Sequence, residues 1–120
     1  MTSMALDNTE LAKSGIDYVE AMERFGNNED LYLRLAVKFL DDPHFSELQK
    51  AMDREDIEGS QREAHSLKGV AGNLSFKDLY RAACKMNEVL NASDMDGAWE
   101  LMPDTQDAYD RVCDALRKIS

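Results

Sequence analysis

The chain has 120 residues, of which 43% are hydrophobic and 32% are charged, as expected for a globular domain rather than a disordered chain. Its formal net charge is −10, which argues against nucleic acid or an anionic membrane as the main partner, because both require a cationic surface. No apolar run approaches the ~20 residues needed to span a bilayer, and we recognise no secretory leader. We therefore expect a cytoplasmic protein that does not insert into membranes.

The first residues differ in character from the rest of the chain. Residues 1–8 are polar and show no periodicity, which predicts a flexible N-terminal segment ahead of a single domain over residues 9–120. Residues 9–14 predict a short helical turn that ends before Gly15.

Two amphipathic helices are expected next. The first has a capping-box pattern, Asp17 followed three residues later by Glu20, and it ends at Gly26. The second starts at Asn27 or Asn28, both of which are good helix caps. Its apolar residues recur at helical spacing: Leu31, Leu35 and Phe39.

Three further helix starts are marked by residues that favour them. Pro43 is expected at the first position of a helix, and Glu55-Asp56 is expected to cap a helix whose apolar residues continue to Leu74. Ser75 with Asp78 three residues later resembles a capping box, with aspartate in place of the usual glutamate. This pair predicts the start of the helix with the clearest apolar pattern.

The last segment, residues 95–119, follows a polar turn at residues 91–94 and contains Pro103, which is expected to kink or split it. Cys84 and Cys113 lie within helical patterns and match no metal-binding spacing, so we expect reduced core residues. No strand pattern of period two is found. The sequence therefore predicts an all-α bundle with short, mostly antiparallel connections.

The most informative helix is the one that contains His65. At about 100° of rotation per residue, its apolar side chains average to one side, and His65 lies roughly 140° away, toward solvent. Four other residues fall within roughly 60° of His65 on this projection: Gln61, Lys68, Gly69 and Gly72.

The two glycines on this face allow two interpretations. Inside a helix each costs about 1 kcal/mol relative to alanine, which would be offset if another protein's backbone approaches closely here. Alternatively, the helix ends near Gly69 or Gly72 with glycine as its C-terminal cap. The apolar stripe continues past Gly69 to Leu74, which argues against an early end.

The chemistry of this face suits phosphoryl transfer. A largely neutral imidazole has a nucleophilic ring nitrogen, and phosphoryl transfer needs mainly positioning and charge stabilisation. Lys68 lies one turn from His65 and is placed to stabilise the phosphoryl charge. If the following helix runs antiparallel, Asn87 is a candidate acceptor for the other ring nitrogen, although an ordinary flanking residue is an equally open interpretation.

These residues closely resemble the phosphohistidine motif of histidine-containing phosphotransfer (Hpt) domains of multistep two-component phosphorelays. The resemblance rests on residues 64–69 and 72–74, and it extends through residues 15–25, 31–40 and 79–90. It implies an antiparallel four-helix bundle with short additional N-terminal helices. The active histidine of such a domain is exposed in the middle of a helix.

The resemblance also implies roles for individual residues. His65 would be the phosphoacceptor, Lys68 the phosphate-side cation, and Gly69 the residue that leaves room for a receiver domain, with Gly72 and Gln61 on the same binding face. Asn87 falls where related domains often carry glutamine or glutamate. A second departure is Ser75, where glycine commonly follows the leucine.

The implied function is that of a phosphorelay intermediate without autonomous catalysis. It accepts a phosphoryl group from a receiver-domain aspartate and passes it to another receiver. Response-regulator receiver domains and a sensor or hybrid histidine kinase are the implied partners. No cofactor is expected on this chain, because the divalent metal would belong to the receiver.

Other interpretations remain open at this point. A helical adaptor that binds receiver or kinase domains without phosphorylation fits the same pattern, as does a substrate domain cut from a larger kinase. A di-iron bundle would need Glu-x-x-His motifs on facing helices. Arg62 occupies the position three before His65, and we expect His44 to be a polar residue in the first turn of its helix.

Overall fold

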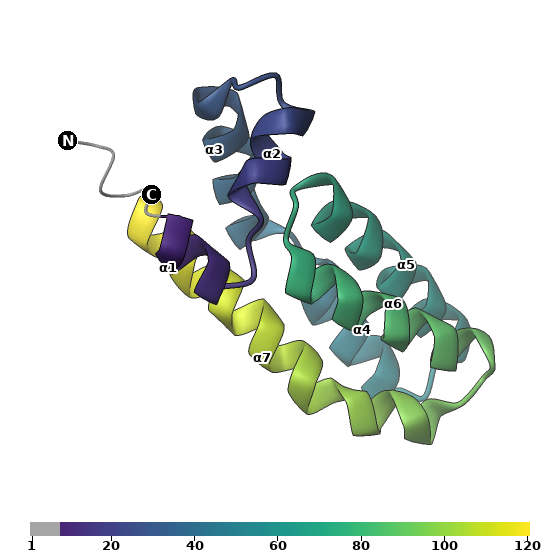
Figure 1. The fold of residues 1–120 in the computed structure, drawn as a ribbon. Coiled ribbons are helices and arrows are strands. Elements are labelled where there is room, and N and C mark those ends of the chain that lie inside the picture. The colour runs from purple at the N-terminus through teal and green to yellow at the C-terminus, as the bar shows by residue number, and fades with distance from the viewer. Residues whose placement is uncertain (1–7) are drawn as a thin grey trace.

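The computed structural model describes residues 8–120, and it consists of helices joined by short turns (Figure 1). The segment predicted to be flexible, residues 1–8, lies outside the described residues except for Asn8. In chain order the elements are α1 (Asn8–Lys13), α2 (Tyr18–Arg24), α3 (Glu29–Lys38), the 3-10 turn η2 (Phe39–Asp41), α4 (His44–Asp53), α5 (Ile57–Asn73), α6 (Lys77–Asn91) and α7 (Met95–Ile119).

Helices α4 to α7 pack on one another and form the bundle. The N-terminal helices lie at one end of it (Figure 1). Helix α5 packs between α4 and α6, and α6 in turn packs on α7. Helices α2 and α3 stand beside the turn that joins α5 to α6, whereas α1 lies along the C-terminal part of α7. The predicted all-α four-helix bundle with short additional N-terminal helices is confirmed.

Four helices begin where the sequence predicts, because a short polar side chain caps each of them. In every case this side chain accepts a hydrogen bond of 2.8–3.1 Å from the backbone N–H three residues later. Helix α4 differs slightly, since Pro43 precedes its first residue instead of occupying it. The four capping residues are Asp17, Asn28, Asp56 and Asp94.

The predicted capping box at Ser75 and Asp78 is wrong. Ser75 has a left-handed backbone with φ of 59°, and Phe76 occupies the cap position of α6 without a side-chain bond. The Ser75 hydroxyl donates to Glu20 Oε1 at 2.8 Å, and the Asp78 carboxylate pairs with Arg111 at 3.1 Å. Contacts between distant segments therefore take both side chains away from the helix start.

Pro103 does not split the last helix, contrary to one of the two expected outcomes. Helix α7 runs from Met95 to Ile119 with Pro103 in its interior. Proline removes one backbone donor, but the helix on either side of it is held against the bundle by buried residues that include Met102 and Ala108. Packing of the apolar face maintains the helix across the missing bond.

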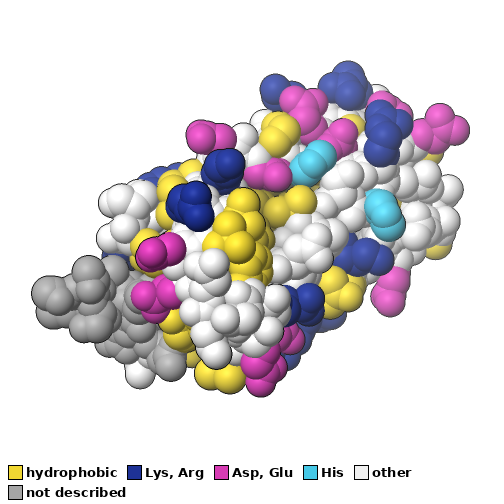
Figure 2. Space-filling view, turned by 90° about the horizontal axis from the view of Figure 1, so that it is seen from above, with side chains coloured by type: hydrophobic (Ala, Val, Ile, Leu, Met, Phe, Trp, Pro, Cys, Tyr) yellow, Lys and Arg dark blue, Asp and Glu magenta, His cyan; other side chains and the backbone are white. Residues whose placement is uncertain are grey.

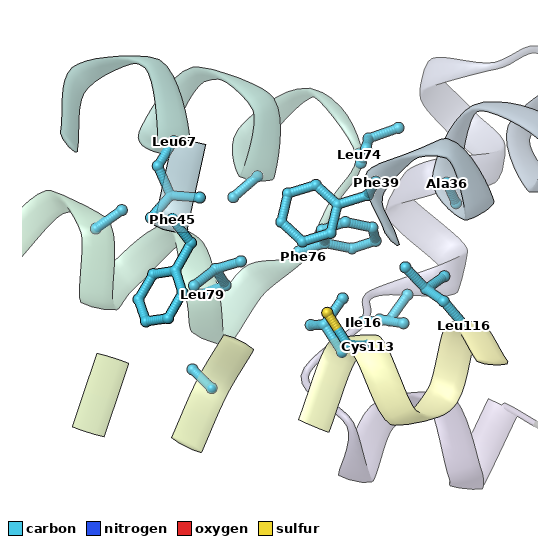
Figure 3. Packing of buried hydrophobic residues seen from close by; sticks show 14 of the residues in the cluster. Ile16, Ala36, Phe39, Phe45, Leu67, Leu74, Phe76, Leu79, Cys113 and Leu116 are labelled. Carbon is cyan, nitrogen blue, oxygen red and sulfur yellow. The ribbon is translucent and has the colours of Figure 1, made fainter. Parts of the chain in front are cut away.

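Aromatic rings join the bundle to the N-terminal helices (Figure 3). Phe39 from the 3-10 turn and Phe76 from the α5–α6 turn meet edge to face, with ring centroids 5.1 Å apart. Phe39 also meets Tyr109 of α7 edge to face at 5.7 Å, and Tyr109 stacks on Phe45 of α4 at 4.3 Å. These rings pack in preferred geometries as one connected cluster, which joins η2, the α5–α6 turn, α4 and α7.

Backbone contacts attach the N-terminal helices to the α5–α6 turn. Ile16 and Phe76 form an isolated antiparallel bridge. The buried hydroxyl of Tyr32 on α3 donates to the backbone carbonyl of Leu74 at 2.7 Å, and burial raises the pKa of Tyr32, which keeps this donor protonated. The carbonyl at the end of α5 is thereby satisfied inside the protein.

Both cysteines are free thiols, as predicted. Cys113 belongs to the buried core, and burial raises the pKa of its thiol, so it stays protonated and unreactive. Cys84 on α6 is only partly buried, so the prediction of a core position is confirmed fully for Cys113 alone.

We expect Leu79→Ala to lower the free energy of unfolding by about 3 kcal/mol, because Leu79 is fully buried and its truncation leaves a cavity. Urea denaturation followed by circular dichroism measures this change. Leu35→Ala serves as the matched control, since Leu35 is 37% exposed, and its cost should stay below about 1 kcal/mol. Equal losses for the two variants would contradict the assignment of the core.

Candidate functional site

His65 lies near the middle of α5 and is exposed, as the helical projection predicts. Ala64 and Leu67, which lie on the opposite face of this helix, are completely buried. Both histidines of the chain are visible on one face of the molecule, with acidic as well as basic side chains around them (Figure 2). The packing of the apolar face of α5 thus presents the imidazole of His65 to solvent.

Helix α5 continues through both glycines and ends at Asn73, with Leu74 as its C-cap. It therefore does not stop near Gly69, and although its end lies next to Gly72, neither glycine is the cap. Gly69 is exposed, and a Cβ built on it would meet no atom within 4 Å. Lys68 is partly buried and lies on α5 one turn after His65. The candidate site therefore consists of the His65 imidazole, the Lys68 ammonium group and the exposed backbone at Gly69, all on helix α5.

The amide of Gln61 is engaged in the bundle. Its Nε2 donates to the backbone carbonyl of Leu90 at 2.8 Å, which satisfies an orphan carbonyl in the last turn of α6. Gln61 therefore links α5 to α6 one turn before His65, and its contribution to partner binding stays a prediction.

Asn87 lies on α6 and is buried, with 7% of its surface exposed. Neither Asn87 nor the His65 ring makes a side-chain hydrogen bond to any described residue. The expected bond between these two side chains is not formed in this structure. Both nitrogens of the His65 ring are consequently free to meet a partner or solvent.

His44 is the first residue of α4, in the first turn as predicted. Its Nδ1 lies 2.9 Å from Glu63 Oε1 of α5, a contact that the sequence did not indicate because 19 residues separate the two. Across residues 8–120, no three His, Cys, Asp or Glu side chains are grouped as metal ligands. The ligand set that a di-iron bundle requires is not assembled in the described part of the chain.

Further residues near His65 were missed by the sequence reasoning. A surface hollow begins at Lys68 and Gly69 and is also lined by Arg24, Lys77 and Tyr80. These residues come from three helices, so helical periodicity within one segment carries no signal for them. Hydrogen bonding and packing at the α5–α6 turn bring them together.

Comparison with known proteins agrees with this geometry. The family model of the Hpt domain matches residues 41–117, which include all of α4, α5 and α6 and most of α7. The chain belongs to the Hpt domain family. No curated protein and no solved structure matches it.

Hpt domains are phosphotransfer modules of two-component signalling systems, and this Hpt domain therefore has a phosphotransfer role in such a system. Domains of this family interact with receiver domains and histidine kinases. Within the described residues, no helix of this Hpt domain has the length and apolar character needed to cross a membrane. Helices α1 to α3 lie before the matched residues.

The two glycines of this Hpt domain should respond differently to alanine. We expect Gly69→Ala to raise the free energy of unfolding by about 0.5–1 kcal/mol, because alanine favours the helix and its Cβ meets open space. At Gly72 a Cβ would lie 3.1 Å from two ring carbons of Tyr80, so the gain should be smaller. Thermal and urea denaturation measure both changes.

A double variant tests the cause of that difference. In Gly72→Ala combined with Tyr80→Ala, the new methyl group no longer meets a ring, and the helix-propensity gain should return relative to Tyr80→Ala alone. A gain at Gly72 that equals the gain at Gly69 in the presence of Tyr80 would show that this contact has no energetic effect.

Proposed function

We propose that this Hpt domain is a phosphorelay intermediate that accepts a phosphoryl group on His65 from a receiver-domain aspartate and passes it to a second receiver. The observation that carries the proposal is the exposed imidazole in the middle of α5, without a hydrogen bond to any described residue, inside the matched family segment. A group in this position is open to an incoming partner on one side of the helix.

The proposed step exchanges one bond to phosphorus for another. A ring nitrogen of neutral His65 attacks the phosphorus of the receiver's aspartyl phosphate and forms a nitrogen–phosphorus bond. The bond from phosphorus to the aspartyl oxygen breaks, and the aspartate leaves as a carboxylate. The reverse step transfers the phosphoryl group to the next receiver, and the proton on the other ring nitrogen can exchange with water.

Lys68 and Gly69 have complementary roles in this proposal. The ammonium group of Lys68, one helical turn from His65, stabilises the negative charge on the phosphoryl oxygens. Gly69 has no side chain, and a Cβ there would point into open space. This gap supports the idea that a receiver's backbone approaches α5 closely at this point.

In this proposal the chain itself supplies the nucleophile and a cation. The divalent metal that neutralises the transferred phosphoryl group is assigned to the receiver, together with the acceptor aspartate. The chain therefore acts as a phosphocarrier, and its turnover depends on the partner domain.

Phosphorylation can be tested with phosphoramidate and with receiver domains of the source organism that have been phosphorylated by acetyl phosphate. We expect the wild-type protein to gain acid-labile, base-stable phosphate and His65→Gln to gain none. His44→Gln is the matched control, because it removes the chain's other histidine, and it should be labelled like the wild type.

Other results of this experiment would contradict the proposal in distinct ways. Label on His65→Gln would refute the assigned acceptor. Tight binding of a receiver without any label on the wild type would favour the adaptor. Labelling by a kinase catalytic domain but by no receiver would identify a kinase substrate domain.

The role of Lys68 gives a second prediction. We expect Lys68→Ala to slow transfer from a phosphorylated receiver about 10-fold, or about 1.4 kcal/mol in activation free energy, because one charge next to the phosphoryl group is lost. Rapid-quench measurement of phosphoryl transfer gives this rate. Lys118→Ala removes an equally charged, exposed residue at the far end of α7 and should leave the rate unchanged.

A further inference from the structure

A surface hollow of about 430 Å³ lies between α2, α5 and α6, next to the proposed phosphorylation site. Lys68 and Gly69 line it from α5, so it adjoins the site directly. Lys77 and Tyr80 line it from the start of α6. Arg24 at the end of α2 completes it from the part of the chain that precedes the family match.

The charge of this hollow is opposite to that of the whole chain. Among its lining residues are three basic side chains, those of Arg24, Lys68 and Lys77, and one carboxylate, that of Glu20. Glu20 lies 3.5 Å from Arg24 Nε and also accepts a hydrogen bond from Ser75. Neither lysine forms an ion pair with a described residue, so the hollow is locally cationic on a chain of net charge −10.

The lining of the hollow includes an aromatic ring that lies close to a glycine. The Tyr80 side chain is 41% exposed, and two of its ring carbons lie 3.1 Å from where a Cβ of Gly72 would be. The absence of a side chain at Gly72 therefore lets the Tyr80 ring lie close to α5. Aromatic residues and arginine, which this hollow presents as Tyr80 and Arg24, are enriched at protein interfaces.

We propose that this hollow, which we call the cationic groove, binds an acidic surface of the receiver domain and so helps to select the partner. The inference rests on the proposed function and goes beyond it by adding Arg24 and Lys77. Neither residue belongs to the proposed transfer site. Their charges act on encounter with the partner rather than on the chemistry at His65.

The chemistry of the partner supports this occupant. A receiver that holds Mg²⁺ beside its acceptor aspartate would carry one or two carboxylate ligands on the face that meets His65. The cationic groove continues from Lys68 and Gly69, so that face extends over it when the aspartyl phosphate reaches the imidazole. Opposite charges on the two faces accelerate association and disfavour partners with a basic surface.

The test compares wild type with the double variant Arg24→Gln/Lys77→Gln. The probe is the receiver domain, phosphorylated with acetyl phosphate and Mg²⁺, that transfers fastest to the wild type. At an ionic strength of about 0.01 M, where the Debye length is about 30 Å, we expect the second-order rate constant for transfer to fall about 10-fold. At about 1 M salt the two proteins should differ by less than about 2-fold, because screening removes the effect.

The matched control is Arg34→Gln/Lys38→Gln on α3, which removes the same charge from two exposed residues that do not line the groove. It should stay within about 2-fold of the wild type at both ionic strengths. Phosphoramidate should label His65 equally in all three proteins, which shows that the fold and the acceptor are intact.

Two results would overturn the inference while leaving the proposed function in place. One is an unchanged transfer rate in Arg24→Gln/Lys77→Gln at low salt. The other is an equal loss in the control, which would attribute the effect to net charge. If no receiver exchanges phosphoryl groups with the wild type, the proposed function fails and the groove assignment fails with it.

Discussion

The orientation of α5 is the constraint on which the site depends. Ala64, Leu67 and Ala71 are completely buried between the neighbouring helices, and the small alanines allow those helices to approach closely. Side chains on a helix are separated by a fixed rotation, so burial of this face also determines which residues the opposite face presents to solvent. His65 is exposed because Ala64, Leu67 and Ala71 are buried on the other side of the same helix. Packing of the bundle thus determines which face of α5 meets solvent.

The α5–α6 turn is the second element that organises the molecule. Its Phe76 packs on the 3-10 turn and pairs with the segment before α2, while the carbonyl of Leu74 receives the Tyr32 hydroxyl. These contacts place α2 beside the end of α5. Arg24 is thereby brought next to Lys68, although 44 positions separate them in the chain. The charge pattern around the candidate site is therefore a product of tertiary structure.

Sequence reasoning succeeded where local interactions decide the outcome. Caps such as Asp17 and Asp56 act within three residues, so their helix starts could be predicted. The capping box predicted at Ser75 was wrong because a distant partner decides there: the Ser75 hydroxyl binds Glu20, 55 residues away. The bond from the Gln61 amide to a carbonyl of α6 also joins distant residues, and the sequence did not indicate it. Whether Asn87 reaches the imidazole depends on the register of two helices, which spacing along one helix does not determine.

His65, Lys68 and Gly69 all lie on one helix, so the spacing between them is fixed by the rise and rotation of the backbone rather than by contacts between elements. Small shifts of α4, α6 or α7 leave that spacing unchanged. The site thus tolerates breathing motions and sequence drift in the surrounding bundle, provided that α5 stays helical and keeps its buried face. In the proposed relay the chain meets more than one receiver, and this fixed spacing would keep the proposed acceptor, His65, aligned with Lys68 and Gly69 in each complex.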